Sequence, residues 1–497
     1  MAKDEDKTEE TKEEAREDEK KTPEISEQEA SKKLTGTFGR TKVSYTARAA
    51  TQVFEVADKK VSFFYVDYTQ DGADPAERPV LFCFNGGPGS STVWLNLGLF
   101  GPKRMHFDED GFKVGMQGRL VDNPQSILDV CDVVCIDAMG TGLSRTADKD
   151  DAKDFYHFKK DIEAFAAFIV RYLNRNGRWA SPKYLAGESY GTLRAAGLAR
   201  ELFTRYNVEF NGIMLISAVL NYQTVKSDVA WKLFPPGNDL PYMLFLPSYA
   251  ATAWYHRRLP KKLQDEKLTD FLEEVEEFAV GDYWTALAKG DDLDPKTRGR
   301  IVKRMAAYTG LDEEYVDHYD LRVNILRFCK ELLRDRRRTV GRIDSRYTGI
   351  DRVPAGDGIE ADPSLDATGG VAASALNQFL RQELGFDTDE IYEIMSAEVL
   401  QKWDYEDFKN QYVDTSEALR EVMSRSRGTK VFVANGYYDL ATPYFATEYT
   451  FSHMGLDPEV RPNVSMEYYE AGHMMYVHLK SLDRLAGHLR DFVKQTI

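Results

Sequence analysis

A serine between two glycines joins a buried-strand pattern to a helix pattern, and this junction restricts the fold more than any other feature of the chain. Residues 187–191 read Gly-Glu-Ser-Tyr-Gly, the single G-x-S-x-G in 497 residues. The apolar residues 184–186 lead into it, and a helix-like run from 192 to 203 follows. Glycines permit the tight turn that holds a serine at the tip of a strand, with a helix N-terminus behind it. The sequence therefore predicts a nucleophile elbow, with Ser189 as the nucleophile.

Short, continuous apolar runs recur on both sides of this junction. Their length and their content of Val, Ile, Leu and Phe fit strands buried on both faces of a parallel sheet. Apolar residues also recur at helical spacing from Phe158 to Leu173, and Gly177 follows as a stop signal. Because helices alternate with buried strands, we predict a doubly wound α/β domain, and the elbow makes it an α/β-hydrolase fold. The apolar runs are residues 79–84, 131–136, 184–186, 212–217 and 431–434.

Changes in sequence pattern divide the chain into four segments. Residues 1–33 contain almost no large apolar side chains and are predicted to be a disordered, charged tail. Residues 34–221 and 426–497 carry the strand patterns and should form two parts of one core, with antiparallel strands across 41–68. Residues 222–425 are mostly helical and charged. We therefore predict a helical lid inserted between two strands, above the carboxyl ends where ligands bind.

Two residues after position 425 are candidates for the partners of Ser189. In this fold the acid and then the base follow the serine along the chain. Asp439 comes after the apolar run 431–434, and His473 comes after the strand-like run 464–469. A neutral His473 could take the serine proton, and Asp439 would fix its tautomer and stabilise the imidazolium. The lesser histidine candidates are His453, His478 and His488.

A glycine-rich loop follows the first buried strand. Residues 85–91 read Asn-Gly-Gly-Pro-Gly-Ser-Ser. They lack the G-K-[ST] ending and the G-x-G-x-x-G spacing of phosphate-binding loops, so no nucleotide cofactor is expected. In an α/β-hydrolase this loop supplies a backbone N–H to the oxyanion hole. We expect the two donors to be the N–H groups of Gly87 and Tyr190; a purely structural glycine turn is the alternative.

Charge and hydropathy argue against several classes of partner. The net charge of −16 repels phosphate backbones, so nucleic acid is not expected to bind. No apolar run is long enough to span a bilayer, so we expect no membrane segment.

Cys131 and Cys135 would lie on one strand without a neighbouring histidine, so we predict no metal site. The first residues lack the apolar segment of a secretory signal, and a cytoplasmic, reducing location with free thiols fits best.

Six short stretches of the chain together resemble the pattern of a known family. The matching stretches follow the family order across most of residues 75–490, and they are similar to the serine carboxypeptidases, which include cathepsin A and the yeast and plant carboxypeptidases. One stretch of the insertion, residues 246–256, resembles the bacterial members. The matching stretches are residues 85–91, 123–124, 137–144, 187–191, 435–439 and 472–473.

The resemblance implies an exopeptidase that removes C-terminal residues from peptides with a free C-terminus. It implies Ser189, Asp439 and His473 as the triad, and Gly87 and Tyr190 as the oxyanion donors. By the same resemblance, the substrate's terminal carboxylate would be bound by Asn85, Gly86 and Glu188.

Two positions depart from the family pattern. The family's second carboxylate-binding glutamate falls on Leu99, so that contact is missing. The cysteine usual after Gly-Pro-Gly is Ser90, so one familiar disulfide cannot form. The first departure keeps an esterase or acyltransferase with the same triad open as the alternative, since a fold does not fix a function. A non-catalytic binding protein is a third hypothesis, which an intact Ser, His and Asp set disfavours.

Overall fold

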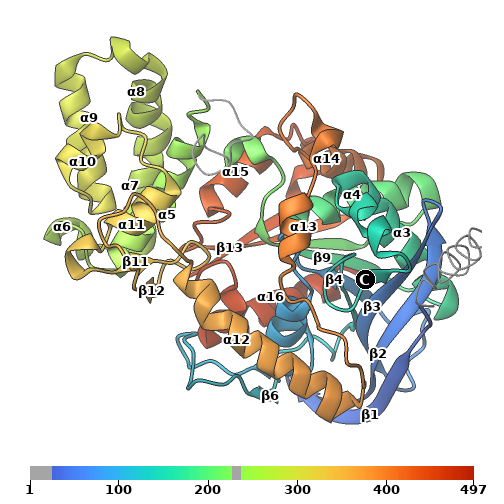
Figure 1. Cartoon of the computed structure of the whole chain (residues 1–497). Helices are drawn as coiled ribbons and strands as arrows, with labels where there is room; N and C mark the ends of the chain where they lie inside the picture. Colours follow the sequence, from blue (N-terminus) through green and yellow to red (C-terminus); the bar gives the residue numbers. More distant parts are fainter. Residues whose placement is uncertain (1–24, 226–236) are drawn as a thin grey trace, which may run out of the picture.

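A ten-stranded mixed sheet forms the centre of the molecule (Figure 1). The computed structural model describes residues 25–225 and 237–497. The sheet order is β1-β2-β3-β7-β4-β9-β10-β13-β14, with β8 paired to β3. Neighbours are parallel from β7 to β14 and antiparallel from β1 to β7. The strands are β1 (Glu29–Phe38), β2 (Thr41–Val56), β3 (Lys59–Gln70), β4 (Val80–Phe84), β7 (Asp132–Ile136), β8 (Arg145–Thr146), β9 (Lys183–Ser189), β10 (Gly212–Ala218), β13 (Lys430–Gly436) and β14 (Val464–Tyr469).

Helices cover both faces of this sheet. On one face α3 (Phe158–Arg175), α4 (Tyr190–Tyr206) and α14 (Ser416–Arg425) share an apolar cluster with alternate strand residues such as Phe82 and Leu185. On the other face α16 (Leu479–Thr496) packs on the opposite strand residues. This layering confirms the predicted α/β-hydrolase fold. The predicted helix at 158–173 and the predicted buried strands are present. Both faces of these strands are covered by helices, so a continuous apolar run is buried on each side.

A helical cap with its own apolar core stands beside the sheet. It meets the sheet domain through Tyr438, Leu440 and Tyr444, which belong to the same cluster. The cap elements are α5 (Leu240–Tyr255), α6 (Lys261–Gln264), α7 (Leu268–Phe278), η4 (Ala279–Tyr283), α8 (Trp284–Lys289), η5 (Gly290–Asp292), α9 (Pro295–Thr309), α10 (Glu313–His318), α11 (Ile325–Glu331), η6 (Arg334–Arg336) and the hairpin β11 (Thr339–Val340) with β12 (Thr348–Gly349).

The predicted lid at 222–425 is larger than this cap. Helix α12 (Pro363–Asn377) and η7 (Gln378–Leu384) lie beside the sheet and share its apolar cluster through Val371, Leu376 and Phe379. Figure 1 shows α12 running toward β1 and the short strand β6 (Leu120–Asp122). Helical periodicity predicts that one side of a helix is buried, but it does not predict which surface that side covers. The remaining segments of this stretch are η3 (Tyr222–Thr224), α13 (Ala397–Lys402) and η8 (Glu406–Phe408).

The predicted disordered tail also ends earlier than expected. Residues 29–33 belong to β1, which pairs with β2 along its whole length, so their assignment to the tail is wrong. Lys32 and Lys33 are exposed, whereas Ala30 and Leu34 pack against the core. An edge strand needs few apolar residues, because one of its margins and much of one face remain in water. Residues 1–24 of the predicted tail lie outside the described residues.

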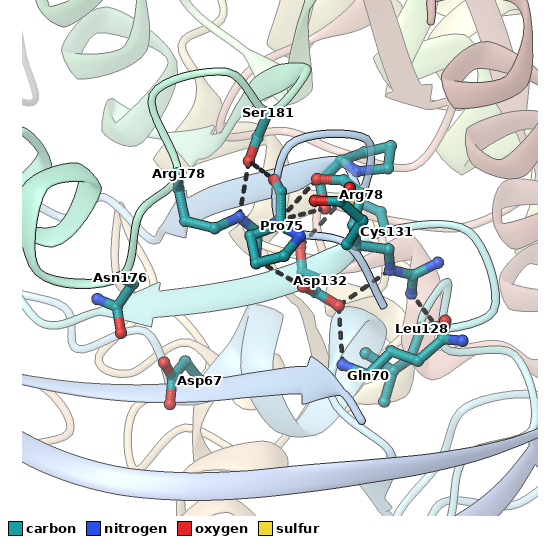
Figure 2. Close-up of polar contacts among 12 residues, drawn as sticks. Asp67, Gln70, Pro75, Arg78, Leu128, Cys131, Asp132, Asn176, Arg178 and Ser181 are labelled. Atoms are coloured by element: carbon teal, nitrogen blue, oxygen red, sulfur yellow. Dashed lines mark hydrogen bonds and ion pairs between the residues drawn. The ribbon is translucent and has the colours of Figure 1, made fainter. Parts of the chain in front are cut away.

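A buried ion network joins three strands at their amino ends (Figure 2). Asp132 accepts from Arg78 Nε at 3.0 Å and from Arg178 Nη1 at 2.6 Å, and it also accepts from the Gln70 N–H. Arg178 donates further to Ser181 Oγ and to the carbonyl oxygen of Arg78. The Asp132 carboxylate is thereby the shared partner of the Arg78 and Arg178 guanidinium groups inside the protein. The network fixes the starts of β4, β7 and β9, at the opposite end of the strands from Ser189.

Candidate active site

Ser189 occupies the tight turn between β9 and α4. Its φ is 61° and its ψ is −129°, a strained conformation for a residue with a side chain. A Cβ on Gly187 would lie 2.0 Å from the Gly191 carbonyl oxygen, and one on Gly191 would lie 2.8 Å from that of Phe84. Only glycines therefore allow the strand, the turn and the neighbouring loop to approach so closely. The predicted strand–turn–helix setting of Ser189 is confirmed.

His473 and Asp439 meet in a buried hydrogen bond. Nδ1 of His473 lies 2.6 Å from Oδ2 of Asp439. The carboxylate also accepts from the N–H groups of Ala441 and Thr442 and from the Thr442 hydroxyl. Burial disfavours a charged His473, but the Asp439 carboxylate outweighs burial, and Glu188 adds to it, so the pKa of His473 is raised. Asp439 can therefore stabilise the protonated imidazolium form of His473.

The sheet places Ser189 at the same edge as this pair. Ser189 is the register partner of Ala218 on β10. The preceding residue, Ser217, donates its hydroxyl to the carbonyl oxygen of His473 at 2.6 Å. Strands β9, β10, β13 and β14 are parallel neighbours, so their carboxyl ends meet at one edge. All three predicted residues follow or end these strands.

A strap of four residues from the end of the cap, 342–345, holds the two loops after β13 and β14 together. The His473 N–H donates to the Ile343 carbonyl at 2.8 Å, and the Gly472 N–H donates to Asp344 Oδ2 at 3.2 Å. On the other side, Leu440 N–H donates to Arg342 and Ser345 N–H donates to Tyr438. The strap therefore fixes the spacing between the base and the acid.

Asp344 is the central side chain of the strap. Its carboxylate receives a buried Arg346 guanidinium, with Nη2 at 2.6 Å from Oδ2. A Cβ on Gly472 would lie 2.4 Å from the Asp344 side chain, which explains the glycine before the histidine. Sequence reasoning missed this strap. The glycine at 472 was its one local signal, and a glycine does not name its distant neighbour.

The glycine-rich loop rests directly on the elbow. A Cβ on Gly86 would lie 2.5 Å from the backbone nitrogen of Tyr190, so the two backbones are in contact. Gly87 has a φ of 103° and is exposed. Arg194, on α4, donates to the Asn85 carbonyl oxygen at 2.6 Å. The same guanidinium forms an ion pair with Asp161 at 2.7 Å. The loop and Tyr190 are thus placed side by side, as the predicted oxyanion donors require.

Glu188 is buried beneath this loop with its carboxylate hydrogen-bonded. Tyr476 Oη donates to Glu188 Oε2 at 2.7 Å, and the Asn85 side chain also bonds the carboxylate. Burial raises the pKa of Glu188 to about 7, although His473, Tyr476 and Asn85 all favour its ionised form. Glu188 and Asn85 are therefore together, as predicted. Tyr476 was missed, since a tyrosine in an apolar run is commonly a core residue.

Several other positions lie outside this cluster. Leu99 is buried in the apolar core, within η1 (Asn96–Phe100). Ser90 accepts from Trp94 Nε1, and all four cysteines are free. The other histidine candidates have different partners: His453 stacks on Tyr449, His478 bonds Ser481, and His488 bonds Tyr469.

A metal site and a membrane-spanning helix are both absent from the described residues. Across 25–225 and 237–497, no group of three or more His, Cys, Asp or Glu side chains is placed to hold a metal ion. Within the same ranges, no helix combines the length and the apolar content that crossing a bilayer requires.

Residues 47–237 match the family model described as serine carboxypeptidase. This part of the chain is similar to the serine carboxypeptidases. The matched region contains the glycine-rich loop and the elbow. The loops of Asp439 and His473 lie beyond it.

Individual serine carboxypeptidases show the same relationship. Carboxypeptidase Y of Saccharomyces cerevisiae is 27% identical over 170 residues, which are 32% of this chain and 28% of that protein. The pheromone-processing carboxypeptidase KEX1 of the same yeast is 32% identical over 135 residues, 26% of this chain and 17% of the relative. The matched part thus spans about a third or less of these curated relatives.

A solved structure extends the likeness in fold. The crystal structure of KEX1(Δ)P, a prohormone-processing carboxypeptidase from S. cerevisiae, aligns with a TM-score of 0.55 at 14% identity. The alignment covers 90% of this chain and 92% of that one. It supports the α/β-hydrolase fold over most of the chain.

Proposed function

We propose that the chain is a serine carboxypeptidase that cleaves C-terminal peptide bonds through an acyl-enzyme on Ser189. The observation that carries this proposal is the 2.6 Å bond between His473 and Asp439, beside a strained serine elbow. The match of residues 47–237 to the family model supports the class of reaction.

The acylation step follows from these groups. Nε2 of His473 takes the hydroxyl proton as Ser189 Oγ attacks the scissile carbonyl carbon. The carbonyl oxygen becomes an oxyanion, to which the N–H groups of Gly87 and Tyr190 donate. Asp439 stabilises the imidazolium formed. His473 then protonates the leaving amine, and the C–N bond breaks.

Deacylation repeats the cycle with water. His473 takes a proton from a water molecule, which attacks the acyl carbon, and the proton returns to Ser189 as the ester bond breaks. The result is the shortened peptide with a new carboxylate. No group beyond the triad and the two N–H donors is needed for this sequence.

Recognition of the free C-terminus is assigned to Asn85, Gly86 and Glu188. The pKa of Glu188 is raised to about 7, so below that pH it can be neutral and donate to a substrate carboxylate. An ionised Glu188 would repel the same group. Exopeptidase specificity in this scheme depends on a buried acid that retains its proton.

The experiment is a comparison of blocked dipeptides with free and amidated C-termini, beside a simple aryl ester. The proposal expects cleavage of the free form and little of the amide. Ser189→Ala should lose nearly all turnover while keeping its melting temperature, since only binding and the oxyanion donors remain. The exposed Ser374→Ala is the matched control. More than a few per cent activity in folded Ser189→Ala would refute the nucleophile.

A specific observation favours one second candidate, an esterase or acyltransferase with the same triad. Leu99, where the family resemblance places a second carboxylate-binding glutamate, is an apolar core residue. A subsite with one acid has fewer donors for a terminal carboxylate. Efficient ester cleavage without any preference for a free C-terminus would select this candidate.

We also propose a cytoplasmic location. Its support is the four buried cysteine thiols in the described structure. Thiol titration after denaturation without reductant should find four free groups in protein isolated from its native compartment. Two or none would contradict a reducing environment.

A further inference from the structure

The hydroxyl of Tyr476 is one of the few polar groups buried next to Glu188. Tyr476 lies in η10 (Met475–Val477), three residues after His473, and its side chain is fully buried. Its ring is fixed against Gly98, where an added Cβ would lie 2.4 Å from a ring carbon. The phenol therefore has one orientation, and Oη points at Glu188 Oε2, 2.7 Å away.

Asn85 also lies beside this pair. Its Oδ1 accepts from the Leu95 N–H at 3.0 Å, and its side chain lowers the pKa of both Glu188 and Tyr476. The phenol donates its hydrogen to Glu188. Burial raises the pKa of Tyr476 well above its usual range, so the phenol keeps that hydrogen at every pH of interest.

Other charged groups also face Glu188. His473, from the loop after β14, favours the ionised carboxylate, while Asp439, from the loop after β13, favours the neutral acid. Neither supplies a hydrogen bond to Glu188 among the described contacts. Tyr476 and Asn85 are therefore the groups that orient its carboxyl plane.

We propose that Tyr476 is a positioning residue of the terminal-carboxylate subsite, which holds Oε2 of Glu188 so that the neutral acid carries its proton on Oε1 and donates it to the substrate. This inference rests on the proposed carboxypeptidase function. A neutral carboxyl group has one carbonyl oxygen and one hydroxyl oxygen, and the oxygen that accepts a phenol hydrogen is the carbonyl one. Tyr476 thereby decides which oxygen becomes the donor.

Tyr476 packs next to the position of the family's second acid. Its ring lies against Gly98, one residue before Leu99, where the resemblance places that acid. In this chain a phenol and an amide, both neutral, complete the subsite around a single carboxyl group. Discrimination for a free C-terminus then depends on one proton, whose position is fixed by Tyr476.

The test is Tyr476→Phe, which keeps the ring and removes the hydroxyl. The matched control is Tyr172→Phe, since Tyr172 is a buried phenol that donates to a carboxylate, Asp67, at 2.7 Å outside the site. KM and kcat are measured from pH 5 to 9 for a blocked dipeptide with a free C-terminus and for an aryl ester.

We expect the KM of Tyr476→Phe for the free dipeptide to rise about 5- to 20-fold at pH 5.5. Its kcat, and its KM for the ester, should stay within about twofold of wild type, as lost carboxylate binding predicts. The phenol favours ionised Glu188, so its loss should move the midpoint of the rise in KM to higher pH. Tyr172→Phe should change none of these.

A structural role alone would raise the KM for both substrates and leave the midpoint unchanged, and that result overturns the inference. Binding of the intact blocked dipeptide, with a free or an amidated C-terminus, to the inactive Ser189→Ala separates the two proposals. If Ser189→Ala binds the free form and not the amide, but adding Tyr476→Phe to it does not weaken binding, the inference alone fails. If wild type shows no preference for a free C-terminus, the proposed function fails. The inference then fails as well, because it rests on that function.

Discussion

Nδ1 of His473 lies 2.6 Å from Oδ2 of Asp439, although the two residues are 34 positions apart in the chain. The bond exists because β13 and β14 are parallel neighbours that end at the same edge of the sheet. Four further contacts from 342–345 keep the two loops at this spacing. The geometry leads to four expectations.

The first concerns the acid. Asp439→Asn should lower kcat by about 10³- to 10⁴-fold, because an amide can stabilise the wrong histidine tautomer and cannot stabilise the imidazolium. The loss should be the same for a free dipeptide and an aryl ester, since both need the base. Asp457→Asn, at an exposed turn before β14, is the control. A loss of less than tenfold would remove Asp439 from the triad.

The second concerns pH. The pKa of Glu188 is about 7, so the KM for a free C-terminus should rise as pH increases through 7. Glu188→Gln stays neutral and should lose most of that rise between pH 5 and 8. The kcat of wild type should fall at acid pH as His473 becomes protonated, and this fall should begin at a higher pH than for an ordinary histidine, because the pKa of His473 is raised by Asp439.

The same variant tests the coupling of the two groups. Glu188 raises the pKa of His473, so Glu188→Gln should move the acid limb of kcat to lower pH. The ester serves as the reference substrate, since it has no terminal carboxylate. An unchanged KM profile for the free dipeptide would mean that Glu188 does not bind the terminal carboxylate, and the esterase alternative would gain.

The third concerns the strap. Asp344→Asn breaks the buried pair with Arg346 and should lower the free energy of unfolding by about 3 kcal/mol. It also loosens the Gly472 contact, so kcat should fall about 10- to 100-fold with little change in KM. Asp387→Asn removes an exposed ion pair and is the control. Unchanged kcat in folded Asp344→Asn would show that the strap does not position His473.

The fourth concerns the ion network in Figure 2. Asp132→Asn leaves Arg78 and Arg178 without their carboxylate, so the free energy of unfolding should fall by about 3–5 kcal/mol. Because the network lies at the amino ends of the strands, kcat per folded molecule should not change. Asp122→Asn, which removes an exposed pair with Lys103, should cost less than about 1 kcal/mol. Denaturant unfolding measures the loss of stability, and active-site titration gives kcat per folded molecule. A lower kcat would contradict the expectation that the network does not affect the active site.

Residues that are close together in the chain specify the local chemistry of the site. The elbow at Ser189, the parallel strands and the positions of Asp439 and His473 could be predicted because each depends on residues near it in the chain. Short continuous apolar runs are typical of buried strands, glycines mark tight turns, and side chains that follow parallel strands gather at one edge. The run predicted at 464–469 coincides with β14.

Only the tertiary structure decided which distant surfaces meet. Tyr476 reaches Glu188 across 288 positions, and Asp344 reaches Gly472 across 128. Helix α12 was predicted within the lid, yet its apolar side covers the sheet. An apolar periodicity states that a surface must be buried, and the packing of the whole chain selects its partner. Apart from the glycine at 472, the positions that orient His473 and Glu188 therefore leave no local signal, because their role is defined by contacts between segments far apart in the chain.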